Sequence, residues 1–202
     1  RPPQGGGAVW GAARPPMFVV AKKNIKVILF VPKPVFLDHK KEKCAHIIGA
    51  YGGEHVGDSA ILGGVLLRIK KRRPYITKAI VYSLRPDRTK FWYSGLEGID
   101  IDVEIKPYNH KNFSVFSKQD LLVWAGGPIM EMPNDLLNHY YMTKIFNRIN
   151  IPFEIIGCGW GPFKTKYSKV LANTMVRNAT FVQLRQKVDI KTNYELLRDP
   201  AF

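Results

Sequence analysis

Three glycine-rich segments are the residues of this sequence whose types and spacing favour ligand chemistry. The first spans residues 49–58 and has the sequence GAYGGEHVGD. Glycines let a backbone approach a ligand closely, and the amides that open a following helix attract an anion. The candidate ligand-binding residues of this segment are Gly52, Gly53, His55, Gly57 and Asp58. We expect Asp58 to cap the helix or to bind a sugar hydroxyl; a tight turn closed by a helix cap is the alternative interpretation.

Two further glycine segments, residues 125–128 (AGGP) and 157–162 (GCGWGP), each follow a predicted buried strand. Their candidate ligand-binding residues are Gly126, Gly127, Gly159 and Gly161. If all three segments lie at the carboxyl edge of one parallel sheet, they line a single crevice. Alternatively, the glycines only relieve crowding where each strand becomes a loop. The spacing matches neither a Walker loop nor a dinucleotide-binding fingerprint.

A run of basic residues closes the predicted helix after the first glycine segment. The run consists of Arg68, Lys70, Lys71, Arg72 and Arg73. Cations complement the dipole at the end of a helix, so a solvated helix terminus is the simpler interpretation. The alternative is a contact with nucleic-acid phosphates, to which Lys22 and Lys23 near the N-terminus would contribute. No RNA-stacking motif or zinc finger accompanies the cluster.

Metal and thiol chemistry are poorly supported by the sequence. The five histidines are scattered, and Cys44 and His46 form one close pair without a second pair at zinc spacing, so we expect no metal. Cys158 has no neighbour in sequence that would activate its thiol. Two cysteines cannot form a disulfide framework, which favours a reducing compartment: the cytoplasm, with the mitochondrial matrix as the alternative.

The elements that must position these residues alternate along the chain. Apolar runs predict strands over residues 25–31, 45–50, 76–83, 99–105, 120–124, 153–157 and 180–184. Helical spacing predicts helices over residues 58–72, 134–147 and 168–178, the last with Val170, Leu171 and Met175 turned inward. Short strands that alternate with helices indicate a doubly wound α/β domain, Rossmann-like, with a mainly parallel sheet.

The composition separates a basic N-terminal extension from this domain. The 202 residues carry a net charge of +15, and 46% of them are hydrophobic, which excludes disorder for the bulk of the chain. Residues 1–44 hold nine basic and two acidic residues, so 9 − 2 = +7 of that charge lies there, beside several Pro and Gly. This extension fits a flexible tail, an organellar presequence remnant or an arm that orders on a polyanion. No apolar run reaches about 18 residues, the length of a transmembrane helix.

In order and spacing, the three glycine segments resemble the polysaccharide pyruvyl transferase family over residues 45–202. The first family motif is matched by Gly49, Tyr51, Gly52, Gly57, Asp58 and Ala60. The later family motifs look like residues 126–130, residues 157–162, Leu184-Arg185-Gln186 and residues 199–202. The sequence departs from the family pattern at His55, Gln186 and Asp189, where the family has Asn, Asp and Ser.

The resemblance implies the N-terminal half of a glycosyltransferase-B-like enzyme with two Rossmann-like domains. Such enzymes transfer pyruvate from phosphoenolpyruvate, as a ketal, onto a glycan sugar, and need no further cofactor. The resemblance makes Arg185 and Asp58 the candidate catalytic residues, with Arg185 as an anion clamp because a guanidinium forks onto carboxylate or phosphate. A salt bridge across the sheet edge is the alternative role for Arg185. The family's second domain, with its donor-site histidine, is not found in residues 1–202.

Two further functional hypotheses remain open. The first is a catalytically inactive, basic structural subunit derived from such an enzyme, whose partners would be RNA and neighbouring proteins in a large ribonucleoprotein such as a mitochondrial ribosome. The charge of +15 and the altered motif favour it. The second is peripheral attachment to a membrane through basic residues, which would place the enzyme near lipid-linked sugars.

Overall fold

The computed structural model describes residues 35–36, 43–49, 51–52, 57–93, 98–108, 115–116, 120–131, 133–190 and 194–196. The chain divides into two units, residues 1–32 and 33–202, and every described element belongs to the second. Several predicted features lie outside the described residues: the strand over 25–31, Lys22, Lys23, Gly53 and His55. The division of the chain at residue 44 therefore stays a prediction.

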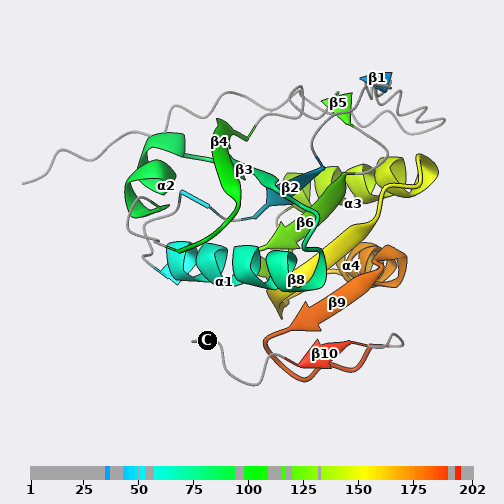
Figure 1. Ribbon diagram of the computed structural model, residues 1–202. Helices are drawn as coiled ribbons and strands as arrows, with labels where there is room; N and C mark the ends of the chain where they lie inside the picture. Colours follow the sequence, from blue (N-terminus) through cyan, green and yellow to red (C-terminus); the bar gives the residue numbers. More distant parts are fainter. Residues whose placement is uncertain are drawn as a thin grey trace, which may run out of the picture. The chain divides into compact units, whose positions relative to one another are not determined.

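Seven parallel strands form the central sheet (Figure 1). Across the sheet they are β10 (Glu195–Leu196), β9 (Phe181–Leu184), β8 (Phe153–Trp160), β6 (Leu121–Ala125), β2 (Cys44–Ile48), β3 (Lys78–Ser83) and β4 (Asp102–Pro107). A short strand, β7 (Pro128–Ile129), also pairs with β8, and β1 (Val35–Phe36) pairs with β5 (Val115–Phe116) in a separate two-stranded sheet. Because every neighbouring pair is parallel, all the carboxyl ends of the central strands meet at one edge.

Helices cover both faces of the sheet. On one face lie α1 (Gly57–Arg72) and α2 (Pro86–Tyr93), and on the other lie α3 (Pro133–Arg148) and α4 (Lys166–Asn178). The chain winds outward from β2 through β3 to β4, then returns to β6 and winds the other way through β8 and β9. This order is that of the doubly wound Rossmann fold, and the direction reverses between β2 and β6. The predicted fold class is confirmed.

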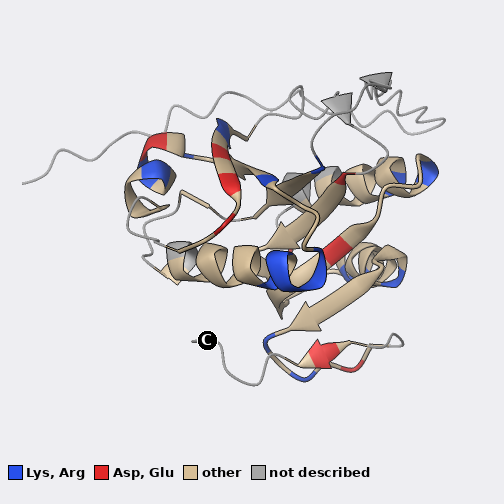
Figure 2. Ribbon diagram, viewed as in Figure 1, with Lys and Arg blue, Asp and Glu red and all other residues tan. Residues whose placement is uncertain are grey.

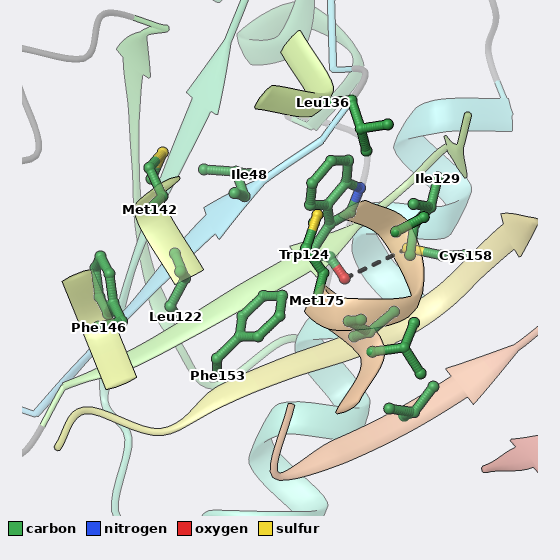
Figure 3. Packing of buried hydrophobic residues seen from close by; sticks show 14 of the residues in the cluster. Ile48, Leu122, Trp124, Ile129, Leu136, Met142, Phe146, Phe153, Cys158 and Met175 are labelled. Atoms are coloured by element: carbon green, nitrogen blue, oxygen red, sulfur yellow. Dashed lines mark hydrogen bonds between the residues drawn. The ribbon is translucent and has the colours of Figure 1, made fainter. Parts of the chain in front are cut away.

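Two apolar clusters hold the helices on the sheet, one on each face. Under α3 and α4, the side chains of Leu122, Phe146, Phe153 and Met175 pack together with Trp124 (Figure 3). Under α1, the cluster comprises residues of α1 and of the strands, among them Ile47, Leu62, Leu66, Ile69 and Val81. Because β2 and β6 are buried on both faces, they form a rigid base for the loops that follow them.

The structure departs from the sequence-based expectations in several elements. Helix α2 and the two-residue strands β1, β5, β7 and β10 were not predicted. Helix α2 buries only Thr89 among its residues, so it has no apolar stripe to recognise. Strand β4 begins at Asp102 rather than at residue 99, because the backbone N–H of Asp102 is the first of this segment to bond to the residue before β3, Thr77. Strand β8 continues to Trp160 and so includes the start of the third glycine segment.

The prediction that Val170 turns inward was wrong. In α4 the buried positions are Ser168, Leu171, Ala172, Met175 and Val176, which recur at helical spacing. Leu171 and Met175 were predicted correctly, but Val170 is 57% exposed because it lies on the opposite face of the helix. The outer face of α4 therefore presents an apolar side chain to solvent.

Candidate functional site

The turns that follow β2 and β6 press against each other where the sheet reverses direction. A Cβ atom on Gly49 would lie 1.7 Å from the carbonyl oxygen of Ala125. A Cβ on Gly126, where φ is +69°, would lie 2.7 Å from the ring of Tyr51. Tyr51 is 1% exposed, and its carbonyl accepts a hydrogen bond from the Leu84 N–H at 3.0 Å. The ends of β2, β3 and β6 are therefore joined at the position where Rossmann-like sheets bind ligands.

Arg185 lies beside the third glycine segment at the same edge. It directly follows β9, and its backbone N–H donates to the Cys158 carbonyl at 2.9 Å. A Cβ on Gly159 would lie 3.2 Å from Nη2 of Arg185 and 3.2 Å from Cβ of Pro128. Because β7 pairs Pro128 with Gly159, the turn at Gly126 and Gly127 continues directly toward the guanidinium.

The alternative role of Arg185, a salt bridge across the sheet edge, is not found: no described carboxylate forms an ion pair with it. The salt bridges in the described parts of the chain involve other cations, which belong mainly to α1, β3 and β4, and Arg185 is exposed. A guanidinium with no internal ion-pair partner keeps its N–H donors for a ligand. This arrangement favours the binding of a carboxylate or phosphate.

The remaining candidate residues lie around this edge. Gly52 has φ +86°, and a Cβ there would lie 2.6 Å from the backbone nitrogen of Arg85. Gly161 follows β8, and its N–H donates to the Ile129 carbonyl at 2.8 Å. Gly57 is the first residue of α1 and is exposed, and Asp58 follows it in the helix. The structure does not describe the side chain of Asp58, so its catalytic role stays a prediction.

A histidine that sequence reasoning did not select lies beneath the same edge. The ring of His139, from α3, lies with its centroid 3.9 Å from that of Trp124 at the end of β6. Its Nε2 is 2.8 Å from the hydroxyl of Tyr108, which directly follows β4. In sequence, His139 is one of five scattered histidines, and only the helical spacing of Leu136, His139 and Met142 marks it as buried.

Both cysteines are buried, and their thiols are unreactive. Burial raises the pKa of the Cys158 thiol to about 12, although the charge of Arg185 acts in the opposite direction. Burial, with a smaller contribution from the charge of Asp120, raises the pKa of the Cys44 thiol to about 12. The Cys158 thiol contacts the Trp124 carbonyl at 3.5 Å (Figure 3). Neither thiol is therefore a nucleophile at neutral pH.

We expect thiol labelling to show this directly. At pH 8, a pKa of about 12 in place of 9.0 lowers the thiolate fraction by about three orders of magnitude, and burial also blocks access. A thiol-reactive disulfide reagent should therefore label the native chain about a thousandfold more slowly than the chain in denaturant. Rapid labelling of either cysteine in the native protein would contradict the burial of the two thiols.

Most cations of the basic run at the end of α1 pair with carboxylates of the same molecule. Arg73 Nη2 lies 2.6 Å from the carboxylate of Glu154, which is 1% exposed on β8. Arg72 lies 3.9 Å from the same carboxylate, and its guanidinium stacks 3.6 Å from the ring centroid of Phe181. Lys70 pairs with Asp100 at 2.8 Å, and Arg68 pairs with Glu195. In Figure 2 the blue end of α1 accordingly lies beside the red segment of β8.

Replacing Arg73 with alanine is expected to destabilise the fold by about 3 kcal/mol, because it leaves the buried carboxylate of Glu154 with a weaker partner. Thermal denaturation measures this. Lys71, which forms no ion pair with any described residue, provides the control: Lys71→Ala should change stability by less than about 0.5 kcal/mol. Equal effects of the two substitutions would show that the contact with Glu154 does not stabilise α1 on the sheet.

The described residues offer neither a metal site nor a membrane span. Across these ranges, no three His, Cys, Asp or Glu side chains converge in the way that metal ligands do. No helix in the same ranges is long and apolar enough to cross a membrane.

Taken together, the strand order, the crossing glycine turns and the exposed guanidinium define a Rossmann-type domain whose carboxyl edge is suited to an anionic ligand. The chain belongs to the polysaccharide pyruvyl transferase family, whose family model matches residues 55–202. No curated protein and no solved structure gives a significant match to the chain.

Proposed function

We propose that this domain is the N-terminal half of an enzyme that transfers pyruvate from phosphoenolpyruvate, as a ketal, onto a sugar of a glycan. The observation that carries the proposal is the exposed guanidinium of Arg185 beside Gly159, at the edge where the glycine turns meet. Membership of the polysaccharide pyruvyl transferase family supports the reaction class. The domain would contribute one wall of the cleft, and a second domain the other.

The reaction has two demands that this edge can serve. The enol carbon of phosphoenolpyruvate takes a proton and becomes a methyl group, and C2 becomes cationic. One sugar hydroxyl adds to C2, the bond from C2 to the phosphate oxygen breaks, and a second hydroxyl adds to close the ketal. The two sugar hydroxyls release two protons. One replaces the proton that the enol carbon took up to become a methyl group, and the other is carried away by the phosphate. The enzyme must therefore hold a carboxylate and a phosphate and must move protons.

Arg185 suits the first demand, because a fork of parallel N–H donors matches the two oxygens of a carboxylate or phosphate. For the second demand, Asp58 is proposed as the group that accepts a proton from an acceptor hydroxyl. Its position supports this, because it is the second residue of α1 and follows the glycine segment after β2. Gly52, Gly126 and Gly127 would let the substrates approach the backbone closely.

The test is release of phosphate from phosphoenolpyruvate by the full-length protein. Incubation with an acceptor glycan should release phosphate in step with the formation of an acid-labile pyruvate ketal on the glycan, which NMR spectroscopy detects through its methyl signal. Omission of the glycan should stop the release. Phosphate release that does not depend on the glycan, or none with any of a broad set of glycans, would overturn the proposal.

The alternative of a structural subunit bound to RNA stays a prediction. It rests on the charge of the chain and on the basic run of α1. Four of the five cations in that run have carboxylate partners in the structure, which leaves Lys71 as the one without an ion-pair partner among the described residues. A distinct cationic surface at the carboxyl edge of the sheet is the better place to look for a polyanion.

A further inference from the structure

The cations that form ion pairs and the cations that form none lie in different parts of this domain. In the half formed by α1, β3 and β4, the cations mostly have carboxylate partners; besides those of α1, Lys78 and Lys106 both contact Glu104. Residues 161–190 are different, because they hold six cations and a single acidic residue, Asp189. The six are Lys164, Lys166, Lys169, Arg177, Arg185 and Lys187. None of the six forms an ion pair with any carboxylate in the described ranges.

Several of these cations alternate with aromatic side chains along the carboxyl edge of the sheet. The turn after β9 is tied to β8, since the side chain of Gln186 donates to the Trp160 carbonyl at 3.0 Å. The rings of Trp160 and Phe163 lie edge to face with centroids 5.1 Å apart, and both are half-buried against the core under α3 and α4. Next come Lys164 and the first turns of α4, where Tyr167 is 62% exposed. We call this row the cationic rim: Arg185, Trp160, Phe163, Lys164, Lys166, Tyr167 and Lys169.

The backbone of the rim is held in place by hydrogen bonds that do not involve its lysine side chains. The carboxylate of Glu131 accepts from the backbone N–H groups of Lys164 and Thr165, the latter at 2.8 Å. Thr165 caps α4, because its hydroxyl accepts from the Ser168 N–H at 3.1 Å. These contacts occupy the amides of Lys164, Thr165 and Ser168. The groups of the rim that carry charge for an anion are therefore its lysine side chains and Arg185.

We propose that the acceptor glycan is acidic and that the cationic rim binds it through its carboxylate or phosphate groups, with sugar rings packed on Trp160, Phe163 and Tyr167. This inference rests on the proposed function. A small donor needs one or two aimed cations, which Arg185 supplies, whereas the lysines of α4 extend away from it along the helix. Aromatic faces pack against the C–H groups of sugar rings, and unpaired cations attract repeated anionic groups. Stacked RNA bases would use similar residues, but family membership favours a glycan.

The test measures the binding of glycans to the protein, without pyruvyl transfer. The full chain is titrated with polygalacturonate (carboxylated), phosphomannan (phosphorylated), dextran (neutral) and poly(U) at low and high salt. We expect one of the two acidic glycans to bind, with an affinity that falls steeply as salt rises, and dextran to bind far more weakly. The Lys166→Gln/Lys169→Gln variant should bind that glycan about fivefold more weakly, and Tyr167→Ala should also weaken it.

The control variant, Lys71→Gln/Lys90→Gln, removes the same charge from the helices of the other face and should bind like the wild type. Binding of dextran as tight as that of both acidic glycans, an unchanged affinity in the Lys166→Gln/Lys169→Gln variant, or an equal loss in the control would overturn the inference. Failure of both acidic glycans to bind would also overturn it, and binding of poly(U) in that case would favour RNA. Pyruvyl transfer to a neutral glycan would in each of these cases still support the proposed function. Binding of an acidic glycan without any transfer would support the cationic rim as a binding surface but would contradict the proposed function, and with it the role of that glycan as acceptor.

Discussion

Replacing Arg185 with alanine is expected to lower kcat/KM for pyruvyl transfer by about two to three orders of magnitude, the usual cost of removing an aimed electrostatic contact to a reacting group. The guanidinium has no ion-pair partner among the residues that the structure describes, so its loss leaves no buried charge without a partner. Its backbone N–H, which bonds to the Cys158 carbonyl, is retained in alanine. The thermal stability of the variant should therefore match that of the wild type.

The matched control is Arg185→Lys, which keeps the charge but loses the fork of N–H donors. If Arg185 binds carboxylate or phosphate through two parallel hydrogen bonds, lysine should recover only part of the activity, with a KM for phosphoenolpyruvate that stays high. Steady-state kinetics at varied phosphoenolpyruvate concentration measure this. Full activity in Arg185→Ala, or a loss of activity that merely follows a loss of folded protein, would remove Arg185 from the site.

The fold was predictable because its signals are local. Buried strands such as β2 and β6 are continuous apolar runs, and α1 repeats Leu62, Val65, Leu66 and Ile69 at helical spacing. The alternation of these elements then indicates a parallel sheet covered on both faces. Helix α2 escaped prediction for the opposite reason: it is short and exposes Phe91 at 70%, so its apolar residues do not mark a buried face.

The site was only partly predictable, because its geometry depends on contacts between distant residues. The glycine turns could be found in the sequence, but not that Gly126 packs on Tyr51 or that Gly159 borders Arg185. The ion pairing of the basic residues could not be predicted from the sequence either. By sequence alone the five cations at the end of α1 carry equal weight, whereas in the structure three of them pair with two carboxylates from distant strands, on β8 and β10. Lys164, Lys166 and Lys169, by contrast, form no ion pair with any carboxylate that the structure describes.

Gly49→Ala is expected to destabilise the fold more than the loss of any surface cation. The new Cβ would lie 1.7 Å from the Ala125 carbonyl oxygen, a backbone atom on the neighbouring strand β6 that no side-chain rotation can move away. Strands β2 and β6 would have to separate at the centre of the sheet. We expect a loss of about 4 kcal/mol or more, which lowers Tm by about 10 °C or prevents folding altogether.

A glycine at an open position shows whether this effect is specific to the contact. A Cβ on Gly64, on the exposed face of α1, meets no atom within 4 Å, so Gly64→Ala should raise stability by about 0.5–1 kcal/mol through helix propensity alone. Thermal denaturation of Gly49→Ala and Gly64→Ala measures both effects. If Gly49→Ala unfolds at the temperature of the wild type, then β2 and β6 are not in contact there, and the point where the sheet reverses direction lacks the close backbone approach on which the site depends.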